Sequence, residues 1–61
     1  MCLAFPGRVV KIYKKKERAL IDFGNVKRDV NIALLPKVRV GDLVMVHAGF
    51  AIERVEENEL M

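Results

Sequence analysis

Turn-forming residues interrupt this chain so often that the extended segments between them are at most about seven residues long. Gly24-Asn25 is a two-residue turn able to take positive φ, and Gly41-Asp42 and Ala48-Gly49 are further turn pairs. Pro6-Gly7 predicts another turn near the start of the chain. Short strand signals separated at this spacing are typical of a small β-barrel.

The segments between these turns have the residue pattern of strands. They are rich in β-branched residues, and in 18–23 apolar and polar side chains alternate so that Ala19 and Ile21 share one face. The segment 43–47 is apolar up to its final histidine, which predicts a strand buried on both sides. The stretch 33–42 is less regular and is interpreted as a connector with a short extended piece. We predict strands over residues 8–14, 18–23, 26–32, 43–47 and 50–55.

A chain of 61 residues is one small domain. Closing the sheet into a barrel pairs its two edge strands and so removes exposed sheet edges with few residues. With 52% hydrophobic and 31% charged residues, the composition is that of a globular protein. We therefore predict an all-β fold, a five-stranded OB-like or SH3-like antiparallel barrel over 8–55. An N-terminal arm, 1–7, precedes it and a short C-terminal helix, 56–61, follows. A flat meander is the alternative, but it would expose one apolar face.

The compartment and the classes of partner follow from cysteine content, hydropathy and charge. The only cysteine, Cys2, cannot form an intramolecular disulfide, which favours a reducing compartment. No apolar stretch is long enough to span a bilayer, so we expect a cytoplasmic protein without a membrane partner. The net charge is +3, and Lys14–Lys16 form a basic run. This run is either a solvated turn or a phosphate contact. Nucleic-acid binding would use stacking aromatic residues beside the basic ones, and the sequence leaves Tyr13 alone for that role.

Cys2 and His47 are the residues with metal or nucleophilic chemistry. Motifs for nucleotide binding, zinc proteases and dithiol redox chemistry are absent from the sequence. Cys2 is either a small buried apolar residue or a soft ligand, and His47 is either a core or turn residue or a ligand. Because a structural zinc site needs four ligands, any metal bound here must bring its own ligands or be shared with a partner. The phenylalanines Phe5, Phe23 and Phe50 are predicted to lie in the core.

Two blocks of the sequence, MCLAFPGRV and GDLVMVHAGFAI, closely resemble the two signature blocks of the HypC/HupF family of NiFe hydrogenase maturation chaperones. Both blocks occur in the family order, and the resemblance covers nearly the whole chain as a single HypC-like domain, 1–61. It implies an OB-like barrel with a C-terminal helix and no catalysis of its own. The implied partners are the scaffold protein HypD, the hydrogenase large-subunit precursor, and HypE through the HypC–HypD complex.

The resemblance also implies roles for individual residues. Cys2 matches the family cysteine needed for these complexes and proposed as an iron ligand, and His47 is a second candidate at the iron. The cargo would be iron as Fe(CN)2CO, held transiently and shared with a partner, with no permanently bound cofactor. A nucleic-acid-binding barrel is the alternative function, and a thiol enzyme is a third class. The remaining residues implied are the docking arm, Leu3, Ala4, Pro6 and Gly7, and the signature turn, Ala48, Gly49 and Phe50.

Overall fold

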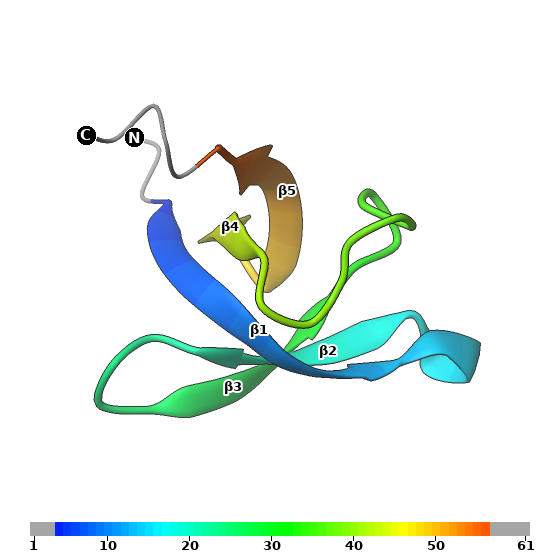
Figure 1. Ribbon diagram of the computed structural model, residues 1–61, viewed down its shortest axis with the longest axis horizontal. Coiled ribbons are helices and arrows are strands. Elements are labelled where there is room, and N and C mark those ends of the chain that lie inside the picture. The colour runs from blue at the N-terminus through cyan, green and yellow to red at the C-terminus, as the bar shows by residue number, and fades with distance from the viewer. Residues whose placement is uncertain (1–3, 57–61) are drawn as a thin grey trace.

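The alternation of apolar residues produces five strands that curl into a closed barrel (Figure 1). The structure, a computed structural model, describes residues 4–56. Neighbouring strands run antiparallel except β3 and β5, which are parallel, and the order around the barrel is β1-β2-β3-β5-β4. This confirms the predicted five-stranded OB-like barrel. The elements are β1 (Phe5–Tyr13), the 3-10 turn η1 (Lys14–Lys16), β2 (Arg18–Asp22), β3 (Lys27–Asn31), β4 (Leu43–His47) and β5 (Phe50–Val55).

Small and β-branched side chains fill the barrel interior. In β2 the predicted alternation is confirmed, because Ala19 and Ile21 are fully buried while Leu20 and Asp22 are half-buried on the other face. One residue of the connector also enters the core, Val38. The complete buried set in the described chain is Val9, Ala19, Ile21, Val30, Ile32, Val38, Val44, Val46 and Ala51.

The first strand begins earlier than predicted, and Pro6 and Gly7 lie within β1 rather than in a turn. Val9 exchanges backbone hydrogen bonds with the segment leading into β4, accepting from Gly41 and donating to Asp42. Strand alternation therefore directs the nitrogen of Pro6 to the opposite side of β1, where pairing with β2 begins only at Arg8. Since no ladder bond is lost there, proline is tolerated. The predicted boundary between arm and barrel moves from residue 8 to residue 5.

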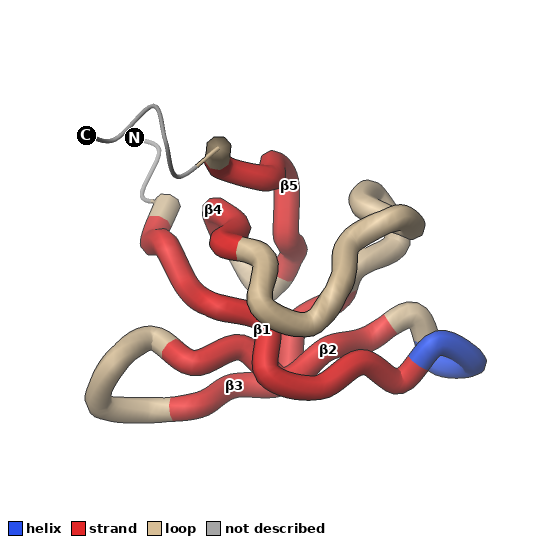
Figure 2. The backbone as a smooth tube through the Cα atoms, viewed as in Figure 1, coloured by secondary structure: helices blue, strands red, loops and turns tan. Residues whose placement is uncertain are grey.

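Three other predictions are corrected or fall outside the description. The predicted strand 8–14 ends one residue earlier, at Tyr13, because Lys14–Lys16 form the turn η1, which Glu17 closes at φ 54°. In β4 only Val44 and Val46 are buried while Leu43 and Met45 are half-buried, so burial on both faces was wrong; in a barrel one face of each strand points outward. The predicted helix 56–61 lies outside the described residues from 57 onward. Figure 2 shows η1 as the one helical segment of the described chain.

Candidate partner-docking site

Pairing between β1 and β4 places the two signature-like blocks of the sequence side by side. Phe5 lies opposite Val46, and the register continues without a shift to Arg8 opposite Leu43. These segments are far apart in the sequence but adjacent in the barrel (Figure 1). Because Ala4 precedes Phe5 and His47 follows Val46, the antiparallel pairing directs both residues to the same end of the barrel.

His47 is half-buried at the end of β4, opposite Phe50 of β5. The turn between them is the predicted Ala48-Gly49, with φ of 54° and 85°. Positive φ at both central residues is the geometry of a tight hairpin turn matched to the twist of the strands. The turn therefore fixes where the strand carrying His47 ends and where Phe50 begins.

Cys2 and Leu3 lie outside the described residues, so the roles predicted for them stay predictions. The covalent chain allows the Cα atoms of Cys2 and Ala4 to be at most about 7 Å apart. Of the other arm residues, Ala4 is half-buried and Pro6 is exposed. Gly7 is buried against Ile21 and Phe23, and a β-carbon there would lie 2.9 Å from Cε1 of Phe23. Gly7 thus belongs to the packing of the barrel.

Two of the three phenylalanines lie on the surface, which contradicts the prediction that all belong to the core. Phe5 is 60% exposed and Phe50 is 43% exposed, whereas Phe23 packs against the core. The interior is filled by alanine, valine and isoleucine, which leaves little space for further aromatic rings. The start of β1 therefore exposes Phe5 at this end of the barrel, and the β4–β5 hairpin exposes Phe50 opposite His47.

An apolar groove of about 530 Å³ opens beside this end of the barrel. Sequence reasoning missed it because its walls come from segments distant in the chain: the start of β1, the β2–β3 hairpin, and β4 with its turn. Asp29, on its rim, is held by Arg18, whose Nε donates to Oδ1 at 2.7 Å. The lining residues are Phe5, Pro6, Phe23, Val26, Arg28, Asp29, Val30, Val46 and Gly49.

A cluster of charged side chains lies at the end of β5. Arg54 donates to the Glu56 carboxylate at 2.6 Å and lies 3.9 Å from Asp42. The hydrogen bond from Arg54 to Glu56, reinforced by the charges of Glu56 and Asp42, raises the pKa of the guanidinium above its ordinary value. Residues 4–56 contain no group of three His, Cys, Asp or Glu side chains able to hold a metal ion. The same residues form no helix long and apolar enough to cross a membrane.

Comparison with known proteins identifies relatives over almost the entire chain. The hydrogenase maturation factor HypC of Synechocystis sp. is 43% identical over 62 aligned positions, covering 95% of this chain and 82% of the relative. The hydrogenase maturation factor HybG of Escherichia coli K12 is 38% identical, covering 97% of this chain and 78% of the relative. The Frd operon uncharacterized protein C of Proteus vulgaris is 48% identical, covering 97% and 67%.

Two of these three relatives are named as maturation factors, which is a chaperone role and not an enzymatic one. This confirms the prediction of a non-enzymatic maturation protein. The family model described as the HupF/HypC family matches residues 1–61. With the two signature-like blocks paired along β1 and β4, the chain belongs to the HupF/HypC family of hydrogenase maturation factors.

Proposed function

We propose that this protein is a cytoplasmic hydrogenase maturation chaperone that binds the HypD scaffold and the hydrogenase large-subunit precursor and helps deliver the Fe(CN)2CO group. The observation that supports this most is the pairing of Phe5 with Val46, which brings the described start of the N-terminal block to the barrel end that carries His47. The two sequence blocks typical of the family thereby form one surface. HypE would be reached through the complex with HypD.

The chemistry proposed for this surface is shared coordination. Cys2 supplies a thiolate and His47 an imidazole, two ligands suited to iron. A metal that already carries cyanide and carbon monoxide needs few further ligands, and two protein ligands are too few to retain it against a better site. Incomplete coordination therefore suits a carrier that must release its cargo to the hydrogenase precursor.

The surface around these residues is suited to protein contact. Phe5, at the start of β1, and Phe50 and Ile52, in β5, are large apolar side chains between 43% and 60% exposed. Aromatic residues are enriched at the energetic centres of protein interfaces because they bury much surface at a small cost in conformational entropy. We assign this exposed surface, together with the docking arm, to contact with HypD and with the hydrogenase precursor.

A pull-down with purified HypD and with the large-subunit precursor tests this function. Cys2→Ala should abolish or strongly weaken both complexes, and His47→Ala should lower the iron content of the HypD complex while the complex still forms. Lys15→Ala, on the exposed turn η1, is the matched control and should bind like the parent. Intact complexes with both partners in the Cys2→Ala variant would contradict the proposal.

Infrared spectroscopy of the HypD complex tests the cargo separately. If Cys2 contributes a ligand to the Fe(CN)2CO group, the cyanide and carbon monoxide stretching bands of the parent complex should shift or disappear in Cys2→Ser. Identical bands and equal iron content in the two complexes would remove Cys2 from the metal site. That result would leave the protein contacts to be judged by the pull-down.

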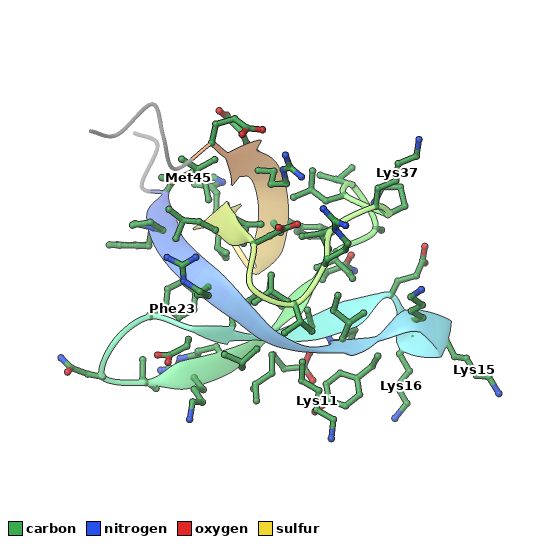
Figure 3. All side chains as sticks on the ribbon, viewed as in Figure 1. Lys11, Lys15, Lys16, Phe23, Lys37 and Met45 are labelled. Atoms are coloured by element: carbon green, nitrogen blue, oxygen red, sulfur yellow. The ribbon has the colours of Figure 1, made fainter. Side chains whose placement is uncertain are left out.

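The alternative of nucleic-acid binding is not favoured by the positions of the aromatic and basic residues. Lys11, Lys15 and Lys16 project around the C-terminal end of β1, away from Phe23 near its other end (Figure 3). Tyr13 is the aromatic residue near these lysines, and the Lys11 ammonium lies 5.5 Å from the centre of its ring. Single-stranded nucleic acid is bound by aromatic rings interleaved with basic residues, an arrangement this surface does not have.

A further inference from the structure

The strand β3 has one edge that is almost unpaired in the described chain. On one side all five of its residues pair with β2, from Arg18 opposite Asn31 to Asp22 opposite Lys27. On the other side the ladder with β5 consists of the single pair Asn31 and Phe50. Within residues 4–56, the second edge of β3 before Asn31 therefore has no strand beside it.

Hydrogen bonds at the end of β3 identify which backbone groups face this edge. The amide of Ile32 donates to Glu17 on the β2 side at 2.8 Å, and the amide of Asn31 donates to Gly49 on the other side at 2.9 Å. Alternation along the strand then directs the backbone groups of Lys27 and Asp29 to the open edge. The Arg18 guanidinium already donates to the Asp29 carbonyl, at 3.3 Å. An added strand would form its main backbone hydrogen bonds with Lys27 and Asp29.

The side chains beside this edge have a definite order. Arg28 and Val30 lie on one face of β3, Val26 directly precedes the strand in the same alternation, and all three line the apolar groove. Within the described residues Arg28 has no ion pair, whereas Asp29 on the rim is neutralised by Arg18. The groove thus has an exposed apolar side chain, an exposed positive one and a buried apolar wall, Val26, Arg28 and Val30, at spacings of two residues.

We propose that the open edge of β3 accepts an extended segment of a protein partner as an added strand, with the pattern apolar, any residue, acidic, any residue, apolar. Residues directly opposite on paired strands share a face, so the acidic side chain would meet Arg28 and the apolar ones would enter the groove. The proposal rests on the proposed function, since the partner would be a maturation protein. Two-fold pairing of β3 with a second copy, centred on Arg28, would instead oppose like charges.

Titration of the 15N-labelled protein with a peptide tests the proposal without any maturation partner. The probe is acetyl-Val-Thr-Glu-Thr-Val-amide, and the control peptide has lysine in place of glutamate. We expect the glutamate peptide to shift the amide signals of Lys27 and Asp29 and to bind about tenfold more tightly than the control, the difference expected from one attractive and one repulsive exposed pair. No shift at these two amides up to about 10 mM glutamate peptide would overturn the proposal.

Variants at one position separate backbone pairing from side-chain contact. Lys27→Pro removes the amide that faces the open edge at the first residue of β3, a position where proline is tolerated, and should weaken peptide binding about tenfold. Lys27→Ala keeps that amide and should bind within about twofold of the parent. Circular dichroism confirms that both variants are folded. Equal peptide affinity in the two variants would exclude strand addition.

Charge reversal tests the role of Arg28. Arg28→Glu should reverse the preference, so that the lysine peptide binds more tightly than the glutamate peptide. Lys37→Glu changes the net charge equally on the connector, away from Phe23 and the groove (Figure 3), and should keep the parent preference. An unchanged preference in Arg28→Glu would overturn the proposal. So would concentration-dependent dimerisation that protects the same amides without peptide, because it would assign the edge to a second copy.

The test distinguishes the failure of this inference from the failure of the proposed function. If Cys2-dependent complexes with HypD and the precursor form while the peptide shifts no amide of β3, the function stands and the added strand is wrong. If the peptide binds as expected while those complexes do not depend on Cys2, the edge is a binding site but the docking role proposed for Cys2 is wrong.

Discussion

Replacing Gly7 by alanine should destabilise the barrel severely, although it adds only one methyl group. The added β-carbon would overlap Cγ2 of Ile21 and lie 2.9 Å and 3.0 Å from two ring carbons of Phe23. Ile21 is fully buried and has no free space into which to move, whereas Phe23 packs against the core on one side and lines the groove on the other. Overpacking of a rigid core costs about 1–3 kcal/mol, and two simultaneous overlaps place this substitution near about 3 kcal/mol.

A loss of this size is a large fraction of the stability of so small a domain. At about 0.05–0.15 kcal/mol per residue, 61 residues give a free energy of unfolding of about 3–9 kcal/mol. The corresponding fall in melting temperature is about 10–20 °C. Thermal and urea unfolding followed by circular dichroism measure both quantities. A Gly7→Ala variant within about 0.5 kcal/mol of the parent would refute the steric argument.

A double-mutant cycle identifies the atom responsible. Ile21→Val retains Cγ2, so Gly7→Ala should cost as much in that background as in the parent. Ile21→Ala removes Cγ2 and leaves space for the new methyl group, so the cost of Gly7→Ala should fall there by more than about 1 kcal/mol. An equal cost in the parent and both backgrounds would show that the destabilisation does not come from this contact.

Further predictions concern the signature turn, the rim of the groove and the end of β5. Ala48 has φ of 54°, so Ala48→Val should lower the free energy of unfolding by about 1–2 kcal/mol, because β-branched residues tolerate the left-handed region poorly. Ala48→Gly should leave the free energy of unfolding unchanged or slightly higher. Urea unfolding of both variants checks this prediction, and equal losses in the two would contradict it. The side chains of Arg18 and Asp29 are 39% and 56% exposed, so a double-mutant cycle with alanine should give a coupling free energy below about 1 kcal/mol that falls as salt is added. A larger coupling that does not depend on salt would mean that the pair is effectively buried. The pKa of Arg54 is raised in the folded state, so its interaction with Glu56 is fully present below the pKa of Arg54 in the unfolded chain and is lost only as pH rises through the folded pKa. Because the folded and unfolded pKa of an arginine both lie above the accessible pH range, the free energies of unfolding of the parent and of Arg54→Ala should run parallel between about pH 8 and pH 11. Curves that diverge in this range would contradict the prediction.

The hairpins were predictable because the residues that specify them are local. Alternation in β2 places Ala19 and Ile21 on the face opposite to Leu20 and Asp22, and Gly24 takes φ of 106° in the turn that follows. The bounds of β4 and β5 agree with the predicted 43–47 and 50–55, because Ala48-Gly49 marks the turn between them. These features depend on side chains within a few residues of one another, which is the range over which a sequence pattern acts.

The errors arise where a strand meets a partner that is distant in sequence. Pro6-Gly7 is a typical local turn signal, but pairing with Met45 and Val44 keeps the chain extended. Phe5 has the hydrophobicity of a core residue, yet its position at the end of the barrel leaves it largely exposed. The groove could not be predicted either, since no local pattern indicates that the start of β1 faces the β2–β3 hairpin. Proximity of the N-terminal block to His47 was likewise left open by the sequence.

The pairing of Phe5 with Val46 has a consequence for the order in which this protein becomes competent. The two residues are 41 positions apart (46 minus 5), so the contact has a high sequence separation and must close about two thirds of the 61-residue chain into a loop. During synthesis, residues 5–8 join the chain before residues 43–46 exist to pair with them. A truncated or partly folded chain would carry the N-terminal block but lack the surface formed with β4, so completion of the fold is itself the condition for forming the proposed docking surface.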